Sequence, residues 1–293
     1  MILQQQLSKI YQEACEIELL AFKPGNVSVY ADGHDMTVAD FRVSAIVSAE
    51  ALCNSDYSLG EKIYYAVKAT REAVACNTNL GIILLCAPLI QAMAEIKKGL
   101  TLRQALQQVL LTTTIEDADW VFKAISLASP GGLGRADDQD VSEKPSITLT
   151  EAMGLASYKD RIALQYISVY QDIFDFAVPI HYNARCKWTD PEWAALSIYA
   201  ALLSRFPDSH IERKYGNQYS EMIAERMSEV SSELSKANKP EQMLPLLYSV
   251  DQEFKVKGLN PGTMADMTVA TVFTVFLEEV INVTLHNKNL PIE

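Results

Sequence analysis

The chain lacks paired cysteines. Its cysteines are odd in number and scattered, with no Cys-x-x-Cys pair: Cys15, Cys53, Cys76, Cys86 and Cys186. A disulfide framework is therefore not expected, and we interpret these residues as small buried side chains in a reducing compartment.

The chain also lacks a basic stretch and a membrane-spanning one. Its formal net charge is −12 over 293 residues, and no segment concentrates Lys and Arg, which argues against a nucleic-acid-binding surface. The most apolar run, 80–96, is interrupted by Pro88 and Gln91 and falls short of a membrane span. The N-terminus carries polar residues throughout, unlike a signal peptide. We expect a cytoplasmic protein that binds neither nucleic acid nor membrane.

Alternating patterns typical of strands are nearly absent as well. Residues 26–30 are one brief candidate, whereas apolar residues elsewhere recur at helical intervals, as Leu7, Tyr11 and Ala14 do. No linker-like composition divides the chain. The sequence therefore predicts a single all-α domain over residues 1–293, with roughly a dozen helices. Beyond the N-terminal segment, helices are predicted at 37–53, 60–75, 80–97, 101–112, 115–128, 150–157, 160–186, 191–206, 209–215, 217–237, 240–255 and 263–286.

Some of these helices begin with the spacing of a capping box, in which Ser or Thr precedes Glu by three residues. The pairs are Ser58–Glu61, Thr148–Glu151 and Ser209–Glu212. These pairs predict where the corresponding helices start.

Several loops share one chemistry, because they put Gly and Asn at or near a helix N-terminus. They are "FKPGNV" (22–27), "CNTNLG" (76–81), "GGLGRADDQD" (131–140) and "LNPGTMAD" (259–266). Free backbone N–H groups and the helix dipole at such positions favour an anion such as a phosphate. Ordinary turn chemistry between helices is the alternative for each loop taken singly. The histidines have no metal-ligand spacing, and His210 is interpreted as a surface or core residue.

The loop at 131–140 is also acidic, with Asp137, Asp138 and Asp140 close together. Three carboxylates repel one another, and oxygen-only ligands suit Mg²⁺, which proteins typically hold with one or two carboxylates plus substrate phosphates. A solvated acidic loop is the alternative. Isolated cations stand in or near the same loops: Lys23, Arg135, Arg161 and Lys214. Together these features indicate a site for a Mg-nucleotide or a diphosphate.

These loops, in this order, resemble the triphosphoribosyl-dephospho-CoA synthase family. The resemblance rests on "KPGNV" followed by "HDM", then "NTNLGI", "GGLG…D.DV", "KDRIALQY", "IERKYG" and "NPGTMAD", which together span residues 23–266. The family's second motif reads nearer "NTHKG", and its "RKYG" region continues into a Gly-Arg-Gly-Glu type stretch. The chain therefore resembles a divergent branch found in archaea and one-carbon-metabolising bacteria. Family members transfer the 5-triphosphoribosyl group of ATP to the 2′-hydroxyl of dephospho-CoA and expel adenine.

The resemblance implies a pentosyltransferase that uses Mg²⁺ and ATP, with dephospho-CoA or a related coenzyme-like acceptor as its other partner. It implies metal or base roles for Asp35, Asp138 and Asp140, with Asp266 in support. The predicted phosphate and sugar ligands are Lys23, Asn26, Asn77, Asn79, Gly132, Arg161, Arg213 and Lys214. We expect these residues to converge on one cleft where loop-to-helix junctions meet.

Two alternatives remain open at this stage. An all-α chain with an acidic D-D-x-D cluster could be a Mg-dependent prenyl-diphosphate enzyme, although such enzymes carry the aspartates on facing helices. A non-catalytic nucleotide- or coenzyme-binding protein would bind ATP but release no adenine. A homodimer also stays open, because the sequence does not settle the oligomeric state.

Overall fold

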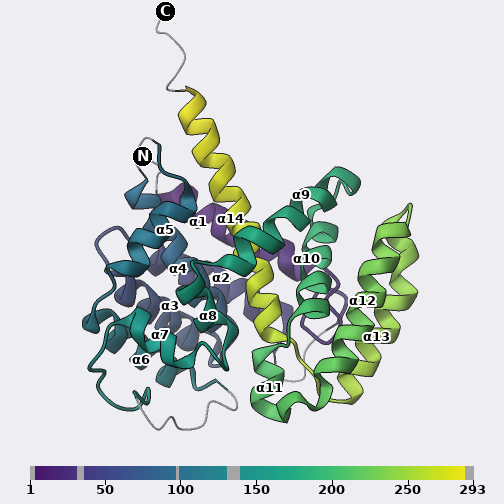
Figure 1. Ribbon diagram of the computed structural model, residues 1–293, viewed down its shortest axis with the longest axis horizontal. Helices are drawn as coiled ribbons and strands as arrows, with labels where there is room; N and C mark the ends of the chain where they lie inside the picture. Colours follow the sequence, from purple (N-terminus) through teal and green to yellow (C-terminus); the bar gives the residue numbers. More distant parts are fainter. Residues whose placement is uncertain (1–3, 32–35, 97–98, 131–138, 288–293) are drawn as a thin grey trace, which may run out of the picture.

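The computed structural model describes residues 4–31, 36–96, 99–130 and 139–287, and it is all-α as the sequence predicts (Figure 1). Within these ranges, extended backbone pairs in an isolated antiparallel bridge between Ser28 and Ala31. The brief alternation at 26–30 therefore founds no sheet. None of the described helices is long and apolar enough to cross a membrane.

Helices α1 to α8 occupy one side of the molecule in Figure 1. In chain order they are α1 (Gln4–Leu20), α2 (Val38–Leu52), α3 (Leu59–Val74), α4 (Leu80–Glu95), α5 (Leu102–Leu111), α6 (Ile115–Ala128), α7 (Leu149–Ala156) and α8 (Arg161–Ser168). Helix α4 is the apolar run noted in the sequence, and nearly all of its side chains are buried.

The other side of the molecule in Figure 1 is built from α9 to α13 and short irregular helical segments. They are the π-helix η1 (Asp172–Ala177), α9 (Val178–Lys187), α10 (Pro191–Arg205), α11 (Ser209–Tyr215), the 3₁₀ helix η2 (Gly216–Tyr219), α12 (Ser220–Lys236), the 3₁₀ helix η3 (Pro240–Met243) and α13 (Leu244–Val256).

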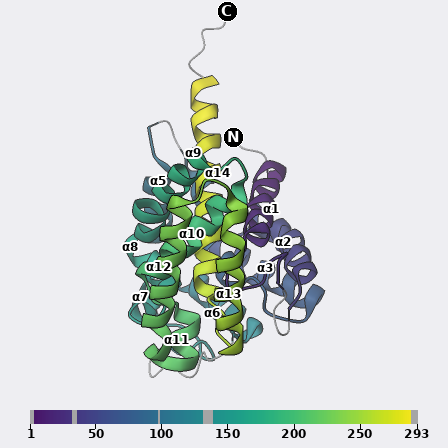
Figure 2. The same cartoon turned by 90° about the vertical axis from the view of Figure 1, so that its right-hand side faces the viewer.

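Helix α14 (Gly262–Asn287) lies between these two groups and crosses the middle of the molecule in both views (Figures 1 and 2). It packs against helices of both groups, including α1, α4, α10 and α11. Thr268, Thr271 and Thr274 are buried along it, and each hydroxyl donates to the carbonyl four residues earlier. Because these hydroxyls are satisfied within the helix, α14 can run through the core with polar residues in it.

The helix predicted over 160–186 is interrupted, which corrects the sequence-based expectation. Val169 and Tyr170 both have positive φ, and the π-helix η1 follows them. The hydroxyls of Tyr166 and Tyr170 donate to the carbonyls of Leu84 and Leu85 on α4, at 2.7 and 2.9 Å. Leu84 is the residue four positions before Pro88, whose missing N–H leaves that carbonyl without its helical donor. Two tertiary hydrogen bonds to α4 thus accompany the break in the predicted helix.

The predicted capping boxes are confirmed at Thr148–Glu151 and Ser58–Glu61. The third is wrong, because Asp208, not Ser209, is the N-cap of α11. Asp208 Oδ1 accepts from the backbone N–H groups of His210 and Ile211 at 2.9 and 3.1 Å. The hydroxyl of Ser209 instead accepts from the backbone N–H of Arg161 at 2.8 Å.

Candidate active site

Segments far apart in the sequence meet around a cavity of about 700 Å³. Its wall includes the end of α1, the starts of α4 and α14, parts of α6, α7 and α8, and α11. Ligand pockets for small molecules are typically of order 300–1,000 Å³ and occur between helices of bundles. The cavity is therefore large enough for a nucleotide-sized ligand.

One side of this cavity is apolar. Leu84, Phe122, Leu149, Met153 and Ile162 contribute to it, and they come from α4, α6, α7 and α8. Such a wall can take a flat ring or an aliphatic chain, which gains free energy by leaving water.

Other parts of the wall are polar and carry charges of both signs. The polar residues that line the cavity include Glu18, Asn26, Asn77, Asp140, Lys159, Asp160, His210, Arg213, Asn260 and Asp266. An apolar wall combined with a few convergent polar groups is typical of a substrate site.

The predicted site residues divide into three groups. Asn26, Asn77, Asp140, Arg213 and Asp266 line the cavity. Asp35, Gly132 and Asp138 lie outside the described residues. The remaining predicted residues, Lys23, Asn79, Arg161 and Lys214, do not line it.

Asp266 lies in the first turns of α14, and its carboxylate packs against the start of α4. A Cβ added at Gly81 would come within 2.0 Å of Asp266 Oδ2, so a larger residue there would displace this carboxylate. Burial raises the pKa of Asp266 well above its ordinary value, and the nearby Glu18 and Asp208 carboxylates raise it further. Among the described residues, no side chain or backbone donor bonds this carboxylate. Asp266 is therefore a protonatable group facing the cavity.

Arg213 reaches the cavity from α11 and pairs with Asp160, the N-cap of α8. Its Nε is buried and has no acceptor among the described residues. A guanidinium presents five N–H donors in a fixed fork. One of these donors, on Nη1, bonds Asp160, so the other donors of the two terminal nitrogens remain for an anionic ligand.

Asp140 lies at the cavity in the loop between α6 and α7. Its Oδ1 accepts from the backbone N–H and the hydroxyl of Ser142, at 2.9 and 2.6 Å. The described part of the chain contains no group of three or more metal-ligating side chains. The metal site expected from Asp35, Asp138 and Asp140 rests largely on residues outside that part.

Asn79 and Lys214 do not line the cavity. Asn79 is the buried N-cap of α4, and its Nδ2 donates to Ser48 Oγ at 3.2 Å, so it joins α4 to α2. Lys214 is exposed on α11, with its Nζ 5.0 Å from the centre of the Tyr215 ring.

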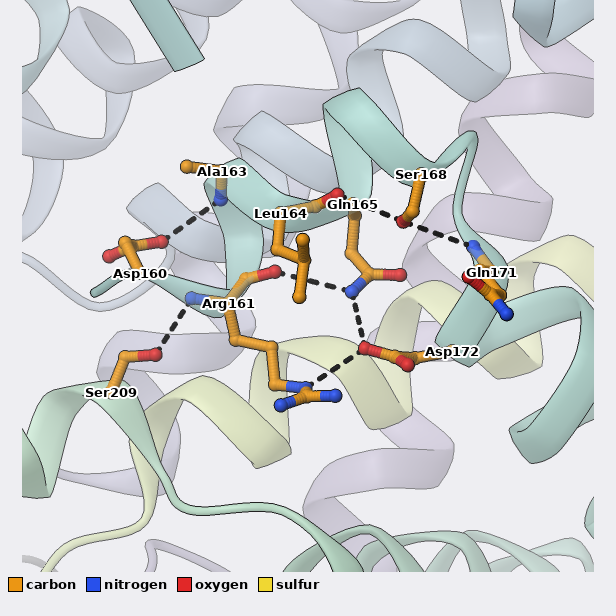
Figure 3. Close-up of polar contacts among 9 residues, drawn as sticks. All are labelled: Asp160, Arg161, Ala163, Leu164, Gln165, Ser168, Gln171, Asp172 and Ser209. Carbon is orange, nitrogen blue, oxygen red and sulfur yellow. Dashed lines mark hydrogen bonds and ion pairs between the residues drawn. The ribbon is translucent and has the colours of Figure 1, made fainter. Parts of the chain in front are cut away.

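Arg161 takes part in a polar cluster beside the π-helix rather than at the cavity (Figure 3). Its Nε donates to Asp172 Oδ2 at 2.9 Å, and Gln165 Nε2 donates to the same oxygen at 2.7 Å. The guanidinium lies 3.6 Å from the centre of the Phe206 ring. These contacts connect α8 to η1 and to the end of α10, which is a packing role.

Lys23 is fully buried, although it was predicted to bind phosphate. Its Nζ lies 2.6 Å from Glu18 Oε1 and donates to Asn26 Oδ1 at 2.7 Å and to the Val27 carbonyl at 2.6 Å. Burial lowers the pKa of Lys23, and Glu18 offsets part of that shift. Lys23 lies behind the cavity wall and contacts two residues that form it.

Sequence reasoning missed several lining residues. Glu18 continues the buried helical spacing of Tyr11 and Ala14, and a charged residue on such a face was an available signal. Asp160 and Asn260 stand inside motifs that were recognised, "KDRIALQY" and "NPGTMAD". His210 carried no signal, because only the tertiary structure brings it to the cavity.

Asp208 joins the N-termini of α11 and α14, the helices that carry Arg213 and Asp266. Besides capping α11, its Oδ2 accepts from the backbone N–H of Met264 at 2.9 Å. Burial raises the pKa of Asp208 to about 6, and these backbone donors oppose the shift. Burial also lowers the pKa of the neighbouring His210 to about 4, helped by the charge of Arg213, so this imidazole is neutral at physiological pH.

Comparison with known proteins identifies the family. A crystal structure of a candidate triphosphoribosyl-dephospho-CoA synthase from Archaeoglobus fulgidus matches with a TM-score of 0.61 at 25% identity, covering 80% of this chain and 97% of that one. A search of curated proteins finds no significant match. The sequence model of the CitG family, described as ATP:dephospho-CoA triphosphoribosyl transferase, matches residues 4–284. The chain, a transferase, therefore belongs to the ATP:dephospho-CoA triphosphoribosyl transferase family.

Proposed function

We propose that this protein transfers the 5-triphosphoribosyl group of Mg-ATP to the 2′-hydroxyl of dephospho-CoA, or of a related coenzyme-like acceptor, and releases adenine. ATP consists of adenine joined to a triphosphoribosyl group, so transfer of that group from ATP leaves adenine behind. The family description names both substrates. It also argues against a prenyl-diphosphate enzyme and against a non-catalytic binding protein.

The observation that carries the proposal is the cavity itself, which combines an apolar wall with charged groups from several of the recognised motifs. In this arrangement the apolar wall takes the adenine ring, and Arg213 takes a phosphate through its unused donors. The glycosidic bond then lies near the carboxyl groups, where positive charge on the ribose anomeric carbon is stabilised.

The charge of the cavity wall favours a metal ion. Its described cations are Lys159 and Arg213, and Arg213 already pairs with Asp160. Its carboxyl groups include Glu18, Asp140, Asp160 and Asp266. Glu18 is paired with Lys23, and the raised pKa of Asp266 favours its protonated form, so the wall has little net charge of its own. The negative charge of a triphosphate therefore exceeds what Lys159 and Arg213 neutralise.

The oxygen donors of the wall suit Mg²⁺, which would neutralise the triphosphate oxygens when bound. Asp140 would hold the ion together with Asp35 and Asp138, in line with the roles predicted from the sequence. The triphosphate is retained in the product, so the ion would serve to bind and orient it.

The reaction needs one proton donor and one proton acceptor. Asp266 carries a raised pKa and is the donor to the departing adenine. A loop carboxylate among Asp35, Asp138 and Asp140 accepts the proton of the attacking hydroxyl. The bond between the anomeric carbon and adenine breaks, its electron pair leaves with adenine, and the acceptor oxygen bonds to that carbon.

A product assay tests this proposal. The protein is incubated with Mg-ATP and dephospho-CoA, and the nucleotide products are separated by chromatography. We expect free adenine in amounts that match the consumed dephospho-CoA, and loss of turnover when Mg²⁺ is chelated. ADP or AMP as the sole nucleotide product would contradict the proposal.

A further inference from the structure

The ammonium group of Lys23 has no donor left for a substrate. An ammonium offers three N–H donors, and those of Lys23 are directed at Glu18 Oε1, Asn26 Oδ1 and the Val27 carbonyl. All three distances are 2.7 Å or shorter, and the side chain is fully buried. Lys23 therefore acts on the two side chains that it holds.

Those two side chains lead to a third. Asn26 Nδ2 donates to Asn260 Oδ1 at 2.7 Å, so a continuous chain of contacts joins Glu18, Lys23, Asn26 and Asn260. Glu18 comes from α1, Lys23 and Asn26 from the loop after it, and Asn260 from the loop before α14. Glu18, Asn26 and Asn260 line the cavity, whereas Lys23 lies behind them.

The chain of contacts leaves specific atoms unused. Glu18 bonds Lys23 through Oε1, and no donor in the described part of the chain bonds Oε2. Asn260 uses its oxygen for Asn26, and its Nδ2 donates to no acceptor in the same part of the chain. A carboxylate oxygen that accepts and an amide N–H that donates thus border one cavity.

This pair of groups suits hydroxyls rather than phosphate. A hydroxyl donates one hydrogen bond and accepts others, so neighbouring hydroxyls can donate to Glu18 and accept from Asn260. A phosphate would be repelled by the Glu18 carboxylate and has Arg213 available to it. In ATP, the ribose joins adenine to the triphosphate. A group that binds the ribose must therefore lie between the apolar wall and the phosphate-binding groups, and the arrangement requires this position of Glu18.

Resting on the function proposed above, we propose that Glu18 and Asn260 form the subsite for the vicinal hydroxyls of the donor ribose. Lys23 is a positioning residue that orients Glu18 and Asn26 and does not touch the substrate. Hydrogen bonds to the 2-hydroxyl of a sugar strengthen as positive charge develops on the ring in glycosyl transfer. This subsite therefore contributes to the rate as well as to the choice of ribose over deoxyribose.

The test pairs changes in the protein with changes in the donor. The rate of nucleobase release is measured for the wild type and for Glu18→Gln with ATP, 2′-deoxy-ATP, 3′-deoxy-ATP and ITP, all with Mg²⁺. The released base is adenine from the first three donors and hypoxanthine from ITP. We expect Glu18→Gln to lower kcat/KM for ATP roughly 10- to 100-fold, as expected for a hydrogen bond to a charged group. The loss should shrink to within about threefold for at least one deoxy donor, since the contact is already absent there.

A matched control is Glu16→Gln, the same chemical change on α1. Glu16 is partly exposed, pairs with Arg42 and does not line the cavity, so this variant should retain the wild-type rate with all donors. If Glu18→Gln does not fold, Asn260→Asp replaces it. That variant keeps an oxygen for Asn26 and loses the donor, so it should show the same dependence on the ribose hydroxyls.

Two outcomes would overturn the assignment of Glu18 and Asn260 to the ribose hydroxyls. Equal losses with all four donors would make Glu18 a group that does not contact the ribose. A loss that disappears only with ITP would place Glu18 at the amino group of adenine. The same comparison on dissociation constants, measured by calorimetry, needs no turnover, so it decides the subsite even if the proposed reaction fails.

The role of Lys23 is tested in the Glu18→Gln background. If Lys23 acts through Glu18 and Asn26, adding Lys23→Met to Glu18→Gln should change kcat/KM for at least one deoxy donor by less than about threefold. A further large loss that is the same for ATP and both deoxy donors would show that Lys23 binds phosphate, and would overturn its positioning role.

Discussion

Lys23 and Arg213 were both predicted to neutralise phosphates, yet the structure places them in opposite situations. Lys23 is fully buried and its three donors are used within the protein. Arg213 reaches the cavity and has a buried Nε with no acceptor in the described part of the chain. A cation in a recognised motif can therefore bind a ligand only through donors that the fold leaves unused.

The largest expected effect is on stability, from Lys23→Met. The Lys23–Glu18 pair is almost completely buried, and removing one partner leaves an uncompensated charge. We expect the free energy of unfolding to fall by about 3–5 kcal/mol. Denaturant unfolding followed by circular dichroism measures this change.

The double variant Glu18→Gln with Lys23→Met is the control for that prediction. It removes both charges, so it should be more stable than Lys23→Met alone. A Lys23→Met variant as stable as the wild type would mean that the ion pair contributes little, and the contrast with Arg213 would lose its basis.

The next effect is on catalysis, from Arg213→Gln. Loss of a charge-assisted hydrogen bond to phosphate should lower kcat/KM for ATP roughly 10- to 100-fold. Arg226→Gln on α12 is the matched control, because Arg226 pairs with Glu229 and Glu253 away from the cavity. Similar kinetics for both variants would contradict the proposed role of Arg213 as a phosphate ligand.

The pH dependence of stability tests the residue that holds α11 to α14. Burial raises the pKa of Asp208 from 3.8 to about 6 in the folded protein. Its contribution to the free energy of unfolding is therefore fully present below about pH 4 and is lost as the pH rises through about 6.

Unfolding of the wild type and of Asp208→Asn, measured at pH 4 and pH 7, isolates that contribution. Relative to the variant, the wild type should lose roughly 2–3 kcal/mol over this range. Taking the difference cancels groups present in both proteins, such as His210. A constant difference at the two pH values would contradict the shifted pKa.

The smallest expected effect is from Arg161→Gln, which extends the comparison to a third motif cation. Arg161 pairs with Asp172 and stacks on Phe206, so we expect a loss of about 1 kcal/mol in stability. The KM for ATP should stay within about threefold of the wild type, as no phosphate contact is removed. A tenfold rise in KM in a stably folded variant would mean that Arg161 contacts the nucleotide.

Local sequence patterns predicted much of the fold. The spacing of Leu7, Tyr11 and Ala14 identified the buried face of α1, and the Thr148–Glu151 capping box marked the start of α7. The break at Val169 and Tyr170 was not predicted, because it goes with hydrogen bonds to α4, which lies far away in the sequence. Local periodicity carries no information about such a partner.

The candidate site, like the fold, was predicted only in part from the sequence. Asn26, Asn77, Asp140, Arg213 and Asp266 were chosen from loop chemistry and line one cavity, while their chemical roles stay predictions. Glu18 was missed, although its place on the buried face of α1 was a signal. The local pattern shows that it is buried, but not that it borders a cavity.

The sequence by itself determined that the protein is helical, where most helices begin, and which loops carry the family's motifs. These properties depend on residues within a few positions of one another, so they can be read locally. Only the tertiary structure decided which charged side chains face the cavity. Lys23, Arg161 and Arg213 carry the same charge, and their difference comes from partners such as Glu18, Phe206 and Asp160 on other parts of the chain.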